Sequence, residues 1–360
     1  MSQDDILSEE HTHHHSGKHR RHHHRRRTIR RILITLVSIP LALIVIAAGF
    51  FAVLNLLGRR QIQAEPAGVQ ENVYSVSYDE GKTLVYNGKT YALNENIVPI
   101  AAIGMDRETF GLQDNKVGTA GQADFIVIAA IDMETGEIRG LMIPRDSMID
   151  VDQFSVSGEY VGVDNMQICL AYAYGDGRKT SAENVLTSAE RVLYGIPLSM
   201  YGVLDLDGIA VLNDAVGGIT VTLQDDYNGA SAGQQITLHG MEAHQFVRSR
   251  DTNALDSDAP RRTRQIQYMR AYLNKIVDAA RQDIGVIRRL YNAATEYGFT
   301  NVSLAKVTYI ATTLLSKGVS LRDITTLQGT LKDADPYPEF HVDEQAAFET
   351  VLDVFYTQVA

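Results

Sequence analysis

The sequence lacks several features that would each place it in a familiar class. Its 360 residues include one cysteine, Cys169, so no disulfide can form within the chain. The apolar neighbours of this cysteine predict a buried thiol rather than a nucleophile. Neither a GxxxxGK[ST] nor a GxGxxG phosphate loop is present in context, and Gly217-Gly218 predict a helix end instead. A disulfide scaffold is therefore excluded, and nucleotide binding has little support.

Positive charge is scarce outside the N-terminal region. The formal net charge is -11 at pH 7, yet residues 1–31 carry eight Lys or Arg against four Asp or Glu. Residues 61–360 carry a net charge of -17, which argues against nucleic acid as a partner of the globular part. With 45% hydrophobic residues, the chain has enough material for one large domain or two modest ones.

One long apolar run is present, over residues 32–57. It holds no charged residue and would form about 39 Å of helix, enough for a tilted membrane span. By the positive-inside rule, the basic segment before it predicts a cytoplasmic N-terminus and an extracellular remainder. A cleavable signal peptide is the alternative, but the run is too long and no clear small-residue cleavage site follows it. We therefore expect an uncleaved, single-pass cell-membrane anchor.

We expect the chain to be organised in five consecutive parts. The N-terminal part holds eight of the eleven histidines and is interpreted as a disordered cytoplasmic tail, with metal binding as the alternative. A small β-hairpin is predicted around Asn87-Gly88, and helices are predicted after residue 283. The parts are the tail at 1–31, the transmembrane helix at 32–57, the stalk and hairpin at 58–95, an α/β domain at 96–283, and a helical C-terminal extension at 284–360 packed on it.

Charged side chains stand at the ends of predicted apolar strands. IVPIAAIG leads to Met105-Asp106-Arg107, and Asp124 begins FIVIAAI, whose hairpin partner IRGLMI is followed by Arg145. In an antiparallel pair the start of one strand and the end of the other lie at the same edge, so Asp124 and Arg145 are predicted to face one site. Two carboxylates near arginines are typical of sites that hold Mg²⁺ and phosphate, although a loop carboxylate is the alternative for Asp106.

The densest cluster of charge lies in FVRSRDTNALDSDAPRRTRQ, from Phe246 to Gln265. Planar guanidinium groups match the oxygens of phosphate, so five arginines in this segment favour a phosphate or pyrophosphate site. A helix is predicted to begin at Asp258, just before Ala259-Pro260. Its spacing predicts one face with Arg261, Arg264, Gln265 and Tyr268, and an adjoining apolar stripe with Ile266, Met269, Leu273, Ile276 and Ala280. The alternative is a surface helix whose arginines pair with nearby aspartates.

These motifs, taken in order, resemble the LytR-CpsA-Psr (LCP) family, whose members attach wall polymers to peptidoglycan in Gram-positive bacteria. The resemblance covers the anchor and roughly residues 96–283, which would be the LCP catalytic domain. It implies the LCP fold, an α/β fold in which a single-span membrane anchor precedes one extracellular domain with a central mixed sheet flanked by helices. The segments that carry it are IAAIGMD, QADFIVIAAIDMETGEIRGLMIPRD, AYAYG, GIPLSMYGVLDLDGIAVLNDAVGGITV and FVRSRDTNALDSDAPRRTRQ.

The resemblance implies a membrane-anchored phosphotransferase. Members of the family take a glycopolymer that is linked through pyrophosphate to a polyprenyl carrier. They transfer the glycosyl phosphate to the C6 hydroxyl of muramic acid in peptidoglycan, in a Mg²⁺-dependent reaction. The polymer would be teichoic acid, capsule polysaccharide or another wall polysaccharide, and the strands and helices between the motifs would enclose the prenyl tail.

The resemblance also assigns roles to residues of this chain. Asp106 and Asp124 would be the Mg²⁺ ligands. Asp258 is a candidate for orienting an arginine or for proton transfer. Gln265 would contact the pyrophosphate, with Arg264 adjacent. Arg107 is a further candidate for a substrate contact, because it lies next to Asp106 and would partly replace the cation that the family has at the position of Gln122. The catalytic arginines at the pyrophosphate would be Arg145, Arg248, Arg250 and Arg261.

Two departures from the family pattern bear on activity. Gln122-Ala123-Asp124 stands where the family has Arg-Ser-Asp, and Gln167-Ile168-Cys169 stands where it has Lys-Ile-Asn. Both departures remove charged or polar groups. They keep open the alternative of a non-catalytic envelope protein that binds polyprenyl (pyro)phosphate lipid or regulates wall assembly. A transcriptional attenuator is a further alternative, which the acidic outward domain and the short cytoplasmic tail oppose.

Overall fold

The computed structural model describes residues 51–59, 61–62, 68–70, 72–105, 110–111, 116–249, 258–335 and 337–359. The chain divides into two compact units, Met1–Val53 and Leu54–Ala360, and the fold described below is that of the second. The expected cytoplasmic tail and the expected membrane span as far as residue 50 lie outside the described residues. Within the described ranges, no helix is both long enough and apolar enough to cross a membrane.

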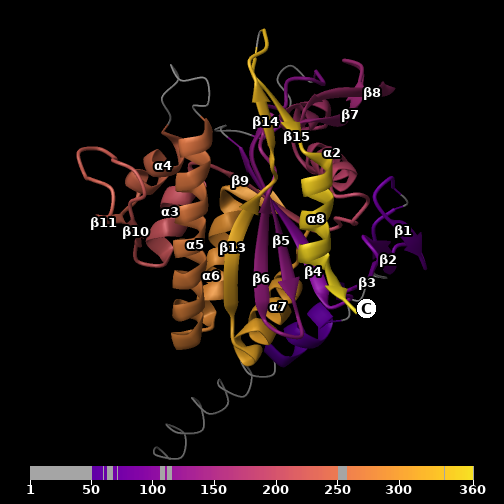
Figure 1. The fold of residues 1–360 in the computed structure, drawn as a ribbon. Coiled ribbons are helices and arrows are strands. Elements are labelled where there is room, and N and C mark those ends of the chain that lie inside the picture. Colours follow the sequence, from indigo (N-terminus) through magenta and orange to yellow (C-terminus); the bar gives the residue numbers. More distant parts are fainter. Residues whose placement is uncertain are drawn as a thin grey trace, which may run out of the picture. The chain divides into compact units, whose positions relative to one another are not determined.

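A six-stranded mixed sheet forms the centre of the second unit (Figure 1). β4, β5 and β6 pair in antiparallel fashion, β9 lies parallel to β4, and β13 lies parallel to β6. The sequence prediction of an α/β domain with a central mixed sheet is confirmed. In spatial order the strands are β12 (Gly298–Thr300), β9 (Tyr201–Asp205), β4 (Ile97–Met105), β5 (Ala123–Asp132), β6 (Glu137–Met142) and β13 (Ser320–Thr326).

Helices flank the sheet on both sides, and the two largest hydrophobic cores among the described residues lie there. One core packs α2 (Lys179–Val192) and α8 (Glu344–Phe355) against alternate strand residues such as Ile103 and Ile128. The other side, left of the sheet in Figure 1, carries a second core built by helices and the two-stranded β10–β11 sheet. Its elements are α3 (Gly208–Ala215), β10 (Ile219–Thr222), β11 (Gln235–Leu238), α4 (Met241–Arg248), α5 (Asp258–Gln282) and α6 (Gly285–Glu296).

The hairpin predicted at Asn87-Gly88 is confirmed. Both residues have positive φ, 51° and 74°, as a two-residue turn between twisted strands requires. The hairpin belongs to a four-stranded sheet whose last strand comes from the C-terminus of the described chain. Its strands are β1 (Val76–Tyr78), β2 (Thr83–Tyr86), β3 (Lys89–Leu93) and β16 (Tyr356–Gln358). Residues near the two ends of the unit are therefore joined by backbone hydrogen bonds.

The C-terminal extension is not purely helical, and the helix predicted for SLRDITTLQGTL is wrong. Residues of this segment form β13 and β14 (Gly329–Lys332), while α7 (Leu304–Lys317) and α8 are helical as expected. The β-branched run Ile324, Thr325 and Thr326 pairs with β6, and this long-range pairing overrides the local amphipathic spacing. Two further hairpins complete the described chain, formed by β7 (Met148–Phe154) with β8 (Tyr160–Gln167) and by β14 with β15 (Glu339–Val342).

Candidate active site

Ends of three strands, β4, β5 and β9, meet at one edge of the central sheet. Met105, the last residue of β4, pairs with Ala123 at the start of β5 and with Asp205 at the end of β9. This edge therefore carries Asp124 on one side of β4 and the buried carboxylate of Asp205 on the other. Asp106 directly follows Met105 in the chain, but it lies outside the described residues, as does Arg107.

Asp124 and Arg145 form an ion pair at this edge, as the hairpin pattern predicted. Arg145 donates through Nη1 to Oδ1 of Asp124 and through Nε to Oδ1 of Asp146, the latter across 3.3 Å. The paired side chains are only 15–16% exposed, so solvent screens their attraction less than it does for a pair on the open surface. Arg145 is thus a cation held between two carboxylates.

One residue from each departure from the family pattern, Gln122 and Cys169, lies against this same arginine. Arg145 donates through Nη2 to Oε1 of Gln122 across 2.5 Å, and its Nη2 lies 3.6 Å from Sγ of Cys169. Cys169 is fully buried, and burial raises the pKa of its thiol to about 11 despite the nearby positive charge. The predicted buried thiol is confirmed. A protonated thiol is a poor nucleophile, so Cys169 shapes the surroundings of Arg145.

Arg264 fastens helix α5 to the end of helix α4. Its guanidinium donates to the carbonyl oxygens of Phe246 and Ser249 and, across 2.9 Å, to Oδ2 of Asp225. The side chain is buried at 6% exposure. In the part of the chain that the structure describes, its acidic partner is Asp225. Arg264 therefore positions Arg248, the last residue of α4, by fixing the backbone around it.

The four residues predicted to share one helical face are all buried, which the sequence did not predict: Arg261, Arg264, Gln265 and Tyr268. Gln265 donates through Nε2 to the carbonyl oxygen of Val247, 3.2 Å away. The expected apolar stripe on the same helix is less buried than this face. Four of its five members are only partly buried: Ile266, Met269, Leu273 and Ile276. Arg250 lies outside the described residues, and Asp258 begins α5 with a side chain that the structure does not describe.

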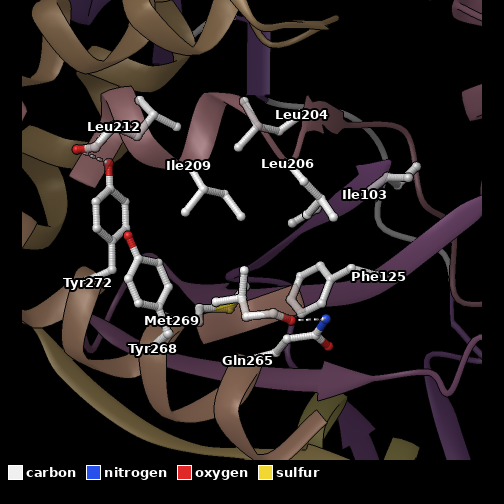
Figure 2. Close-up of a pocket in the computed structure, with 14 residues that line it drawn as sticks. Ile103, Phe125, Leu204, Leu206, Ile209, Leu212, Gln265, Tyr268, Met269 and Tyr272 are labelled. Atoms are coloured by element: carbon white, nitrogen blue, oxygen red, sulfur yellow. Dashed lines mark hydrogen bonds between the residues drawn. The ribbon is translucent and has the colours of Figure 1, made fainter. Parts of the chain in front are cut away.

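An apolar cavity of about 210 Å³ lies between the sheet, α3 and α5 (Figure 2). The side chain of Gln265 lies on its wall beside Phe125, the residue after Asp124. The sequence did not predict these lining residues, because the cavity depends on how α3 and α5 pack over the sheet. They are Ala102, Ile103, Gly104, Phe125, Gly202, Leu204, Leu206, Ile209, Leu212, Val247, Gln265, Tyr268, Met269 and Tyr272.

Of the two predicted Mg²⁺ ligands, Asp106 and Asp124, only Asp124 lies in the part of the chain that the structure describes. In the described part of the chain, no group of three or more His, Cys, Asp or Glu could hold a metal ion. Among these same residues, however, Oδ1 of Asp124 accepts from Arg145 whereas Oδ2 has no hydrogen-bond partner. A carboxylate with one oxygen left over fits Mg²⁺, which takes one or two protein carboxylates and completes its shell with water and phosphate.

Comparison with known proteins agrees with this architecture. The model of the LytR_cpsA_psr family matches residues 68–352. The chain belongs to this family. The match extends beyond the segments from which the resemblance was inferred and includes the hairpin of β2 and β3 and most of the C-terminal extension.

Sequence identity between this chain and individual members of the family is low. One relative is polyisoprenyl-teichoic acid–peptidoglycan teichoic acid transferase TagV of Bacillus subtilis (strain 168), to which the chain is 25% identical over 266 residues. The aligned region covers 71% of this chain and 64% of that protein. The chain thus spans less than two thirds of the length of this relative. The crystal structure of B. subtilis TagV superposes with a TM-score of 0.55 at 22% identity, covering 71% of this chain and 96% of that one. A structure of TagT bound to LI-WTA superposes with a TM-score of 0.53 at 19% identity. This superposition covers 78% of this chain and 97% of the TagT chain. At these identities the superpositions show a shared LCP fold.

Proposed function

We propose that this chain is a transferase that moves a glycopolymer from a polyprenyl pyrophosphate carrier to peptidoglycan. The observation that carries the proposal is that the apolar cavity is lined by Phe125, the residue that directly follows Asp124 of the charged sheet edge. A prenyl pyrophosphate needs such neighbouring surfaces, one for its tail and one for its phosphates. The name of the TagV relative, a transferase acting on polyisoprenyl-teichoic acid and peptidoglycan, supports this assignment.

The proposed reaction is a phosphoryl transfer. The C6 hydroxyl oxygen of muramic acid forms a new bond to the phosphorus that carries the glycosyl group, and the bond from this phosphorus to the bridging oxygen breaks. Polyprenyl phosphate leaves, and the hydroxyl proton passes to a base, for which Asp258 is the candidate by motif. Positioning and charge neutralisation supply most of the catalysis in such reactions.

Arginines supply the positive charge in this proposal. Arg145, Arg248 and Arg261 would neutralise the pyrophosphate, and Arg250 would join them by its place in the motif. Asp124 and Asp106 would hold Mg²⁺, which when bound neutralises charge on the phosphate oxygens. Arg145 already contacts Asp124, so this arginine would lie beside both the metal ligand and the substrate.

The proposed location is the outer face of the cell membrane. Residues 32–57 would span the bilayer once, with the N-terminus in the cytoplasm. Family membership and the wall-polymer relatives support an extracellular domain. The peptidoglycan acceptor lies on that side of the membrane, so the reaction requires this topology.

A non-catalytic lipid-binding protein is the second candidate. It is favoured by Gln122, whose neutral amide occupies a position at Arg145 where a further cation would strengthen phosphate binding. Such a protein would bind prenyl pyrophosphate without transferring the polymer.

A transfer assay separates the two candidates. Full-length protein is incubated with Mg²⁺, lipid-linked glycopolymer and peptidoglycan oligomers, and the covalent product is measured by mass spectrometry. The transferase predicts product with the wild-type chain and none with Arg248→Ala or Asp124→Ala. Unchanged product in both variants would overturn the proposal, and lipid binding without any product would establish the second candidate.

A further inference from the structure

The last residues of the predicted membrane span pack against α7. Residues 54–59 are helical and belong to the second unit. Asn55 donates through Nδ2 to Oγ1 of Thr312. Gly58 is buried so closely against the carbonyl oxygen of Ala305 that an added Cβ atom would lie 2.2 Å from it. Because the predicted span ends at residue 57, these contacts lie at the expected surface of the bilayer.

Two further contacts continue this packing into the domain. Oγ of Ser303, the residue before α7, donates to Oε1 of Gln61 across 2.7 Å. Ile62 packs against a hydrophobic cluster that includes Val98 of β4 and Val302. Successive contacts thus rise along α7 as they fall along the preceding segment, so the two run antiparallel. The end of α7, at the bottom of the unit in Figure 1, is therefore level with the predicted span.

The face of residues 54–59 that points away from α7 is apolar and exposed. Leu56 and Leu57 are 54% and 44% exposed, although large aliphatic side chains are usually buried. In the proposed topology, lipid chains cover these two residues.

A cationic cleft of about 800 Å³ opens beside these contacts. The charged residues that line it are Arg59, Lys306 of α7 and Glu95. Glu95 pairs with Lys82 across 3.0 Å, whereas Arg59 and Lys306 have no ion-pair partner within the described ranges. Residues 61–360 carry a net charge of -17, so average composition does not explain two such cations in one cleft.

The cleft is separate from the candidate active site. Ile97, the first residue of β4, lines the cleft, whereas Met105, the last residue of β4, lies at the charged sheet edge. Nine strand residues span about 26 Å from first to last, so the cations of the cleft do not reach a phosphate at that edge.

We propose that this cleft binds the headgroup of an anionic phospholipid of the membrane, with Arg59 and Lys306 contacting its phosphate. Guanidinium and ammonium groups bind phosphate through charge-assisted hydrogen bonds, and basic residues beside a membrane span bind anionic lipid. Tyr309 also lines the cleft, and the apolar ring and polar hydroxyl of tyrosine suit the membrane interface. The inference goes beyond the proposed transfer reaction and uses only the proposed membrane span. The bound lipid holds this side of the domain against the membrane, and the candidate active site lies at the other end of the sheet.

Short-chain lipids test the headgroup site. Full-length protein in a non-ionic amphipol is titrated by calorimetry with dihexanoyl phosphatidylglycerol, which is anionic, and with zwitterionic dihexanoyl phosphatidylcholine. We expect the anionic lipid to bind at least about tenfold more tightly. Arg59→Gln and Lys306→Gln should each weaken its binding about fivefold, the factor that one basic residue contributes at an anionic lipid surface. Lys317→Gln removes a charge from the same helix outside the cleft and should bind as the wild type.

Three results of this titration would overturn the proposal. Equal affinity for the two lipids would remove the preference for an anionic headgroup. Unchanged affinity in the double variant of Arg59→Gln and Lys306→Gln would remove these residues from the site. Glycerol phosphate that binds as tightly as phosphatidylglycerol would show a site for a soluble phosphate and not for a membrane lipid.

Fluorescence quenching tests which side of the domain faces the membrane. Because Cys169 is buried, a fluorophore can be attached at Ser316→Cys, near the end of α7, or at Thr330→Cys on β14, both exposed positions. In nanodiscs with lipids spin-labelled at the headgroup, we expect strong quenching at position 316 and little at position 330. Equal quenching at both positions would overturn the orientation. The transfer assay described above does not depend on either result, so failure of this proposal and failure of the proposed function are distinguishable.

Discussion

Gln122 and Cys169 contact one guanidinium group, although 47 positions separate them in the chain. Both lie at Nη2 of Arg145, and the backbone N–H of Cys169 also donates to the carbonyl oxygen of Arg145 across 3.1 Å. Gln122 and Cys169, one from each departure from the family pattern, therefore belong to a single structural feature of this chain. They leave Arg145 beside one neutral oxygen and one thiol, where the family pattern has an arginine and an asparagine.

Gln122 is expected to hold Arg145 in the orientation that faces the substrate. Gln122→Ala removes the oxygen that accepts from Nη2, at a cost of about 1 kcal/mol for a partly exposed hydrogen bond to a charged group. We expect affinity for a prenyl pyrophosphate to fall about fivefold. Calorimetry with geranyl pyrophosphate measures this change. Gln122→Asn, which keeps the amide on a shorter side chain, serves as a matched control, and equal affinity of Gln122→Ala and wild type would contradict the expectation.

The thiol of Cys169 is expected to be unreactive in the folded protein. Its pKa of about 11 leaves almost no thiolate at pH 8, so a thiol reagent such as DTNB should label the chain only after denaturation, when one thiol per chain reacts. Rapid labelling of folded protein at pH 8 would show that Cys169 is exposed.

The same shift makes stability depend on pH. The pKa is raised above its usual 9.0, so the folded state favours the protonated thiol. This contribution to stability is fully present below about pH 9 and is lost as the pH rises towards 11. Cys169→Ser lacks this titration, so its unfolding free energy should decline less over that range in denaturant experiments. Parallel declines in the two proteins would contradict the assignment.

Arg264 is expected to matter for stability. Arg264→Ala removes a buried guanidinium that ties α5 to α4, and it leaves Asp225 without its partner. Because the Asp225 side chain is 41% exposed, we expect a loss of about 2 kcal/mol, less than for a fully buried pair. Urea unfolding measures the loss. Arg270→Ala on the same helix removes an exposed pair with Asp323 and should cost less than about 0.5 kcal/mol. Equal losses in the two variants would contradict a structural role for Arg264.

Transfer is expected to require a divalent cation through Asp124. Chelation should abolish product formation, and added Mg²⁺ should restore it. Asp124→Asn keeps the shape of the side chain but removes its charge, so it should raise the Mg²⁺ concentration for half-maximal activity at least about tenfold. An unchanged Mg²⁺ requirement in Asp124→Asn would remove this residue from the metal site.

The sequence predicted those parts of the site that depend on local pattern. Asp124 and Arg145 lie 21 positions apart on one hairpin, so turn chemistry and strand pairing were enough to bring them together. The start of α5 at Asp258 likewise followed from a local signal, proline in its first turn.

The remaining parts depend on contacts between distant segments. The cavity is lined by residues of the sheet, such as Gly104 and Gly202, and by residues of α3 and α5, and no local spacing reveals which helices will cover these strands. Asp106 was singled out because it is a carboxylate at the end of an apolar strand. Asp205 also stands at the end of an apolar strand and lies at the same edge, so the same criterion could have identified it. The strand β13 was missed because its partner, β6, is about 180 residues away, where only tertiary pairing decides between helix and strand.

The most direct test of the central claim is the amount of polymer bound covalently to the wall. In cells that lack this chain, we predict polymer released into the medium and less polymer in the purified wall, with a smaller yield of polymer-linked muramic acid 6-phosphate. Expression of the wild-type chain should restore the wall-bound fraction, whereas Asp124→Ala should not. Equal wall-bound polymer with and without the chain, or full restoration by Asp124→Ala, would contradict a transferase that acts through this site.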